Sequence, residues 1–174
     1  QAHGFSPRKY VYLNLGASIE KRRWMVERFS ELASRILKKT PWNIMLGGGG
    51  REDHKRSLAI LSQLNSPRVS TDCSHSLMES ASIISQARLM VTTDTGPMHI
   101  GFAVRTPVLG LFGAYSPKST GPYEIPDSLC RVITIKPEDQ IYFNEENLGE
   151  SHFKNITVDR VWEQVEKMLA KSST

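Results

Sequence analysis

Two patterns of apolar residues alternate along the chain. Short, continuous apolar runs predict strands buried on both faces, at residues 10–15, 43–46, 89–92, 108–112 and 131–135, with a brief further strand at 68–70. Apolar residues at helical spacing predict amphipathic helices, over residues 24–39, 52–64, 76–86, 94–103 and 158–170. The alternation predicts an α/β fold in three layers, with a parallel sheet between two layers of helices.

The same spacing selects the residues that the helices are expected to bury. For the second and third helices these are Leu58, Ile60, Leu61 and Leu64, and Leu77, Ala81, Ile83 and Ile84. The first helix is expected to start at Trp24. Residues 114–130 are rich in proline and predict a long ordered loop that flanks a ligand at the sheet's carboxyl edge.

Composition narrows the class of protein without choosing a function. The chain has 174 residues, of which 39% are hydrophobic and 23% charged, as in one soluble globular domain. The net charge of +4 can attract phosphates, anionic lipids or nucleic acid. Cys73 and Cys130 lie far apart and are interpreted as reduced thiols. The five histidines have no metal-binding spacing, so no metal site is expected.

The sharpest motif is the run Asp94-Thr95-Gly96-Pro97, between an apolar strand and a helix. An Asp or Thr can cap the helix, Gly96 allows close approach to the backbone, and Pro97 suits a first helical turn. Free N–H groups at that end favour phosphate or diphosphate. A well-capped corner without a ligand is the alternative. The Asp-Thr-Gly triplet of aspartic proteases is disfavoured, because those enzymes need two such carboxylates in an all-β fold.

Two further loops follow predicted strands, where ligands of parallel sheets bind. After the first strand, Gly16 begins a loop with three consecutive cations, of which Lys21 and Arg22 are candidates to neutralise a phosphate. After the second strand, four glycines at 47–50 permit either a tight turn or the approach of a base or ribose to the backbone. This run is neither a Walker loop nor a GxGxxG motif.

Together these motifs resemble glycosyltransferase family nine, the lipopolysaccharide heptosyltransferases. The specific part is the run at 94–99, supported by Leu111-Phe112-Gly113, by Thr120-Gly121-Pro122 and by the loop and helix at 16–33. The resemblance implies a Rossmann-like domain, the C-terminal, donor-binding half of a GT-B enzyme. It implies that residues 1–9 are a linker from an N-terminal domain and that residues 10–174 form a nucleotide-sugar-binding domain. Met25 stands where the family usually has Pro.

The resemblance also implies roles for single residues. Asp94 would touch the donor sugar, while His99 would support or contact the diphosphate. The expected remaining donor-site residues are Ser18, Lys21, Arg22, Gly48, His75, Thr95, Gly96, Pro97 and Met98. Of these, Thr95, Gly96 and Met98 would lie at the diphosphate, Lys21 or Arg22 would be the phosphate cation, and His75 would line the nucleotide. The catalytic base belongs to the N-terminal domain, so no catalytic residue is expected in this chain.

The function implied is inverting, metal-independent transfer of a sugar, with no cofactor besides the nucleotide diphosphate-sugar donor, ADP-heptose in this family. The sequence contains no D-x-D motif. The expected partners are the donor, the N-terminal domain and, through that domain, a lipid-linked oligosaccharide acceptor. We expect a cytoplasmic location with at most peripheral contact at the bacterial inner membrane. A nucleotide-sugar or phosphate binding module without catalysis is the alternative. A nucleic-acid binder is disfavoured, because the aromatic residues fall mostly at core positions.

Overall fold

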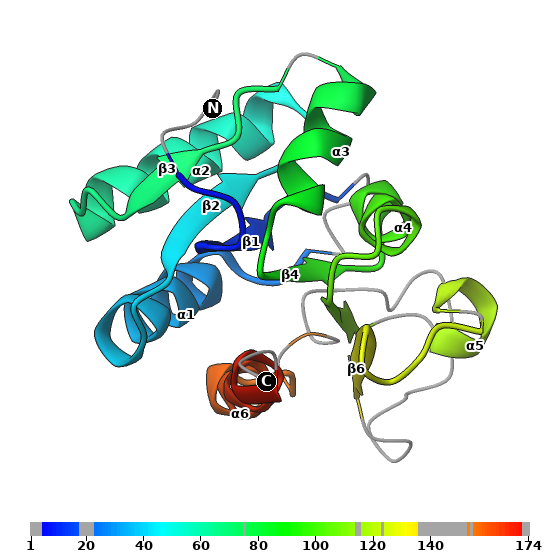
Figure 1. Ribbon diagram of the computed structural model, residues 1–174. Helices are drawn as coiled ribbons and strands as arrows, with labels where there is room; N and C mark the ends of the chain where they lie inside the picture. Colours follow the sequence, from blue (N-terminus) through cyan, green and yellow to red (C-terminus); the bar gives the residue numbers. More distant parts are fainter. Residues whose placement is uncertain are drawn as a thin grey trace, which may run out of the picture.

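The computed structural model describes residues 5–17, 23–74, 76–113, 116–122, 124–135, 153 and 155–171. Its strands form one sheet in the order β3-β2-β1-β4-β5-β6, and each neighbouring pair is parallel (Figure 1). The strands are β1 (Tyr10–Asn14), β2 (Asn43–Gly47), β3 (Val69–Thr71), β4 (Leu89–Thr93), β5 (Val108–Phe112) and β6 (Cys130–Thr134). The predicted α/β parallel-sheet fold is confirmed.

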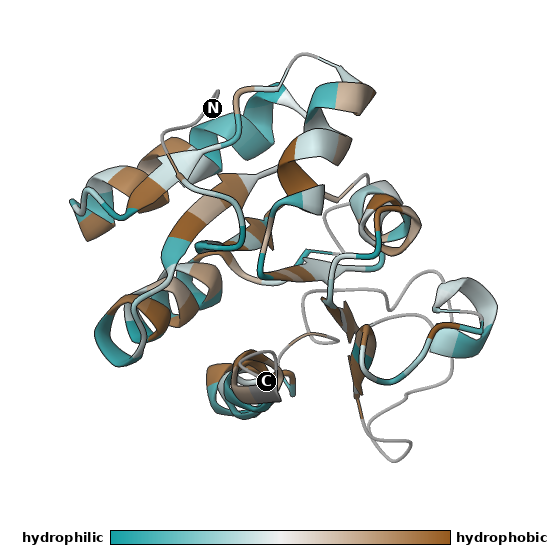
Figure 2. Cartoon of the chain, in the orientation of Figure 1, coloured by the Kyte–Doolittle hydropathy of each residue, from teal (hydrophilic) through white to brown (hydrophobic). Residues whose placement is uncertain are grey.

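Helices cover both faces of this sheet (Figure 1). They are α1 (Val26–Lys39), α2 (Arg51–Leu64), α3 (Leu77–Ser85), α4 (Gly96–Ala103), α5 (Pro117–Thr120) and α6 (Val158–Lys171). Helices α1, α2 and α6 bury apolar residues in one cluster against the sheet, while α3 and α4 contribute to a second cluster on the other face. The strands are apolar on both sides as a result, and brown is frequent on the strands while teal is frequent on α1, α2 and α6 (Figure 2).

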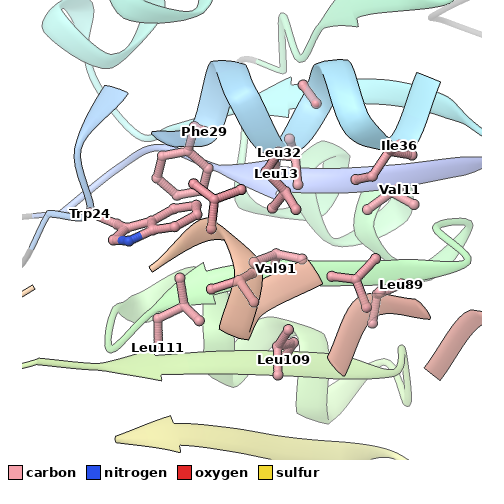
Figure 3. Close-up of a cluster of buried hydrophobic side chains, with 14 of the residues drawn as sticks. Val11, Leu13, Trp24, Phe29, Leu32, Ile36, Leu89, Val91, Leu109 and Leu111 are labelled. Carbon is pink, nitrogen blue, oxygen red and sulfur yellow. The ribbon is translucent and has the colours of Figure 1, made fainter. Parts of the chain in front are cut away.

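The first apolar cluster holds the segment that leads into α1. Trp24 lies before the helix rather than inside it, and its ring packs edge-on against Phe29 at 4.8 Å (Figure 3). The indole Nε1 donates a hydrogen bond of 2.8 Å to the carbonyl of Ile156, which lies just before α6. The predicted start of the helix at Trp24 was therefore too early, because Trp24 serves a contact 132 residues away.

Two predicted core residues are exposed instead. Leu58 is 45% exposed, because Asp53, Ser57 and Ile60 occupy the buried face of α2. Leu77 is 69% exposed, because it starts α3 beside a pocket. In both cases the helical spacing was right about the helix, and wrong about which residues a neighbouring layer covers. The predicted loop 114–130 contains the short helix α5.

The strand order places a ligand crevice at one position of the sheet. From β1 the chain proceeds outward through β2 to β3, and then returns to the other side of β1 to form β4, β5 and β6. At this topological switch point the loops after β1 and β4 lead to helices on opposite faces. In doubly wound sheets of this kind, ligands bind outside the carboxyl ends of the two central strands.

Candidate functional site

Two adjoining pockets lie at the carboxyl ends of the central strands. The first has a volume of about 520 Å³ and is lined by the loops after β1, β2 and β4 together with Thr120. The second has a volume of about 720 Å³ and extends toward the loop after β3 and the start of α3. The pockets share a border formed by Gly49, Gly50, Gly96 and Pro97. A single ligand of sufficient length can therefore extend into both pockets.

The first turn of α4 presents its amides to the first pocket. Thr95 is the N-cap residue, with the extended backbone usual there, but its side chain makes no capping hydrogen bond. Pro97 has no N–H, and the Met98 amide donates to the Thr95 carbonyl at 3.0 Å. The Gly96 amide has no protein acceptor within the described part of the chain. This helix end retains an unfilled donor and its positive dipole, which together suit an anion.

Asn14 explains why Thr95 does not cap its own helix. The Asn14 side chain is 1% exposed at the end of β1, and its Nδ2 lies 3.1 Å from Thr95 Oγ1 and 2.9 Å from Thr92 Oγ1. The Thr95 hydroxyl also lies 3.3 Å from the Thr93 carbonyl, to which it donates. These contacts turn the hydroxyl toward the sheet, which leaves the first turn of α4 open.

Asp94 supplies a carboxylate at the opening of the first pocket. The residue is 7% exposed at the end of β4. Its Oδ2 accepts a hydrogen bond of 2.9 Å from Thr120 Oγ1, which comes from α5. This hydrogen bond restrains the orientation of the carboxylate. Such a group can accept a hydrogen bond from a ligand hydroxyl.

A largely buried ion pair forms another part of the wall of the first pocket. Arg23 Nη1 lies 2.7 Å from Asp53 Oδ1, and their side chains are 15% and 7% exposed. Asp53 Oδ2 accepts from the Gly49 amide at 3.2 Å, and Arg23 Nη2 donates to the Ala17 carbonyl at 2.5 Å. The pair therefore joins the loops after β1 and β2 to the start of α2.

The second pocket has a different chemistry. Tyr12 forms part of its wall and donates from its hydroxyl to Asp72 Oδ2 at 2.7 Å. Burial, with the nearby Asp72 carboxylate, raises the pKa of Tyr12 well above 10. Ser74 and Ser80 bond to each other through their hydroxyls at 2.6 Å, and Ile100 adds apolar surface. Hydroxyls and apolar groups of this kind suit the nucleoside part of a ligand more than its phosphates.

The structure brings together most of the predicted site residues that it describes. Asp94, Thr95 and His99 line the first pocket, Gly48 lines the second, and Gly96 and Pro97 line both. The predicted residues Ser18, Lys21, Arg22 and His75 lie outside the described residues. Met98 lines neither pocket: its side chain is fully buried against the sheet, and its amide donates to the Thr95 carbonyl. A helical first turn has one face toward the ligand and one toward the core, and Met98 occupies the latter.

Sequence reasoning overlooked Asn14, Arg23 and Asp53 as site residues. Arg23 carried a signal, as the third of three consecutive cations. Asp53 read as an ordinary acidic residue in the first turn of a helix. Its partner Arg23 lies 30 positions earlier, and only the sheet order brings the two together. Thr120 belongs to the loop that was expected to flank the ligand, although no role was assigned to it.

Fold and site define a Rossmann-like α/β domain with a crevice suited to an anionic ligand. The family model of glycosyltransferase family 9 (heptosyltransferase) matches residues 1–147. The chain belongs to this family. It is 27% identical over 178 residues to the lipopolysaccharide heptosyltransferase 1 of Pseudomonas aeruginosa, covering 95% of this chain and 49% of that protein. It is 26% identical over 159 residues to the lipopolysaccharide heptosyltransferase 2 of Salmonella typhimurium, covering 86% and 43%.

Solved structures share the fold of the chain. The Escherichia coli heptosyltransferase WaaC with ADP aligns with a TM-score of 0.76 at 18% identity, over 94% of this chain and 45% of that one. The Escherichia coli ADP-heptose lps heptosyltransferase II aligns with a TM-score of 0.79 at 24% identity, over 98% and 49%. The expected fold, one half of a GT-B glycosyltransferase, is confirmed. The chain spans about half the length of the curated relatives it matches.

Two kinds of feature are absent among the described residues. None of their helices has both the length and the apolar character that crossing a membrane requires. No three His, Cys, Asp or Glu side chains among them are grouped so as to hold a metal ion.

Proposed function

We propose that the chain is the donor-binding half of an inverting, metal-independent glycosyltransferase. The enzyme would transfer a sugar, heptose in the relatives named above, from a nucleotide diphosphate-sugar to a lipopolysaccharide-core acceptor. The observation that carries the proposal is the open first turn of α4, with the unfilled Gly96 amide beside the oriented carboxylate of Asp94. Structures of similar fold are described with ADP and with ADP-2-deoxy-2-fluoro heptose, which is the same ligand chemistry.

In this proposal the diphosphate occupies the first pocket and the nucleoside the second. The Gly96 amide and the dipole of α4 stabilise the charge that develops on the leaving diphosphate. Asp94 accepts a hydrogen bond from a donor-sugar hydroxyl and so places the anomeric carbon. An acceptor hydroxyl then attacks that carbon from the face opposite the diphosphate, and its proton passes to a base on the other half of the enzyme. The chain alone is expected to bind the donor without transferring the sugar.

Titration of the chain with ADP, UDP and single-stranded DNA at two salt concentrations tests the binding function. We expect saturable binding of a nucleotide diphosphate, weakened in the Asp94→Ala variant when the ligand carries its sugar. Salt-sensitive binding of DNA without binding of nucleotides would contradict the proposal, since it would show a phosphate-backbone surface instead.

A module that binds nucleotide-sugars without catalysis is the second candidate, and the separation of binding from transfer distinguishes it. The test joins the chain to the amino-terminal half of a relative and measures transfer of heptose to an acceptor. Transfer by the joined protein, lost in Asp94→Ala with folding retained, supports the enzyme. Donor binding without any transfer supports the module.

A further inference from the structure

One buried side chain joins the ends of the two central strands. Asn14 ends β1, and its Nδ2 donates to the hydroxyls of Thr92 at 2.9 Å and Thr95 at 3.1 Å, which lie 78 and 81 positions further along the chain. The same nitrogen lies 3.3 Å from the carbonyl of Gly16 in the loop after β1. Asn14 therefore ties the loop after β1 to the turn after β4, and both of these segments line the first pocket.

The orientation of the Asn14 amide follows from the hydrogens of this cluster, because each hydroxyl has only one to donate. Thr92 Oγ1 and Thr95 Oγ1 both donate to the carbonyl of Thr93, at 2.9 and 3.3 Å. Neither hydroxyl has a hydrogen left for Asn14, so only the NH₂ end of the amide can face them. Asn14 Oδ1 faces away from them and, although buried, has no hydrogen-bond partner among the described residues.

The unpartnered oxygen sets a cost against the bonds that the amide makes. A buried acceptor without a partner lowers the stability of a fold. Leucine has the same branched shape as asparagine and would bring no such acceptor, while the two threonine hydroxyls would still donate to the Thr93 carbonyl. A polar group retained at this cost calls for an explanation beyond packing. The bond to Thr95 supplies one.

That bond changes what the N-terminus of α4 offers to a ligand. A threonine at the N-cap position ordinarily turns its oxygen toward the first turn, where it accepts from an amide, and here Met98 is the candidate because Pro97 has no N–H. The lone pairs of that oxygen would then compete with an anion for the helix end. Held at 3.1 Å by Asn14, the Thr95 hydroxyl makes no capping bond. The helix end stays available as a result.

We propose that Asn14 is a positioning residue of the donor site, which holds the Thr95 hydroxyl away from the N-terminus of α4 so that the diphosphate can bind there. The inference rests on the proposed function and adds to it a residue that acts on the diphosphate through Thr95. Without the Asn14 amide, Thr95 caps its own helix, and the ligand has to displace this cap. The resulting loss of affinity requires the Thr95 hydroxyl.

The variant Asn14→Leu removes the N–H groups while it keeps the branched shape and the net charge. We expect it to bind inorganic pyrophosphate and ADP about fivefold more weakly than the wild type, because the open helix end is populated in only part of the molecules. Adenosine carries no phosphate, and its affinity should change less than about twofold. Titration calorimetry measures all three ligands, and thermal unfolding shows whether the variant is folded at the temperature of the titration.

A double-mutant cycle with Thr95→Val separates positioning from a merely structural role. Valine keeps the β-branched shape of threonine but cannot cap, so no cap has to be displaced in this background. Asn14→Leu should therefore change the affinity for pyrophosphate less than about 1.5-fold in the Thr95→Val protein, against about fivefold in the wild type. Thr92→Val is the matched control, because Thr92 bonds to the same amide but lines neither pocket. This control alone should change the affinity less than about twofold.

Three results would overturn the role of Asn14 while leaving the proposed function in place. They are wild-type affinity for pyrophosphate in Asn14→Leu, an equal loss with and without the Thr95 hydroxyl, and an equal loss for adenosine. If Asn14→Leu is unfolded, Asn14→Ala takes its place in the same cycle and is judged by the same three results. If the wild-type chain binds neither ADP nor pyrophosphate, the proposed function is overturned together with this inference.

Discussion

The two pockets differ in the kind of group that forms their walls. Ionised side chains and an unfilled backbone amide form the first, in which Arg23, Asp53 and Asp94 surround the open turn at Gly96. The second pocket also has ionisable side chains in its lining, Arg51, His54 and Asp72, but it differs from the first by its several hydroxyls and by the apolar surface of Leu77, Ile84 and Ile100. The difference fits the proposed donor, because a nucleoside diphosphate joins an anionic part to a neutral part and could span the shared border. Variants that act on one pocket alone can test this division.

The largest effect on binding is expected at Gly96, on the border. A Cβ at this position would meet no protein atom within 4 Å, so the protein does not need a glycine there for its own packing. A methyl group would instead occupy the space through which a diphosphate approaches the backbone. We expect Gly96→Ala to fold as stably as the wild type and to bind ADP at least about tenfold more weakly, which is about 1.4 kcal/mol.

Gly48→Ala is the converse variant and provides the comparison for Gly96→Ala. Its methyl group would overlap Asp53, so its first effect is on folding, measured as a fall in the midpoint of thermal unfolding. If Gly96→Ala bound ADP normally, the open turn of α4 would not be the diphosphate site. If Gly96→Ala were destabilised as strongly as Gly48→Ala, its glycine would serve packing after all.

A smaller and more selective effect is expected from Thr120→Val. This change removes the hydroxyl that donates to Asp94 while it keeps the size of the side chain. Asp94 is proposed to contact the sugar, so the variant should bind ADP normally and ADP-heptose about fivefold more weakly. Competition binding with the two ligands measures the ratio, and Thr120→Ser should restore it. A parallel loss of affinity for both ligands would contradict the assignment of Asp94 to the sugar.

The sequence was sufficient to predict the parallel sheet, because each buried strand and each covering helix can be recognised from the pattern of apolar residues within its own segment. Continuous apolar runs such as 89–92 must be covered on both faces, and helices between them supply the cover. The Asp94 motif was found for the same reason, since its meaning depends on a strand before it and a helix after it. These features depend only on residues that are neighbours in the chain.

The remaining features depend on residues that are distant in the chain. The indole of Trp24 donates a hydrogen bond to the carbonyl of Ile156, and the guanidinium of Arg23 donates to the carboxylate of Asp53. The spacing of apolar residues along the chain does not predict such contacts, because the presence of each partner residue can be explained by its own local segment. Met98 shows the same dependence inside a local motif: the direction of its side chain depends on which face of α4 meets the sheet.

The thiols offer a test confined to the second pocket. Cys73 is exposed and lines this pocket, whereas Cys130 is buried, which raises its pKa to about 11. At pH 8 only about one Cys130 in a thousand is a thiolate, so a thiol reagent should label Cys73 far faster. We expect ADP and adenosine to slow the labelling of Cys73 several-fold, and pyrophosphate to leave it unchanged. If pyrophosphate protected Cys73 from labelling as well as ADP does, the anion would bind in the second pocket, which contradicts the proposed division.

The smallest expected effect is on the stability of the folded chain. It arises from Tyr12 in the wall of the second pocket and appears only at alkaline pH. Burial raises the pKa of Tyr12 well above 10 and that of Tyr10 to about 12. Between pH 10 and 12 the unfolded chain loses protons that the folded chain keeps, so stability is lost as the pH rises. The midpoint of thermal unfolding should therefore fall over this range, and less steeply in Tyr12→Phe. An equal fall in both proteins would show that Tyr12 ionises as readily in the folded chain as in the unfolded one.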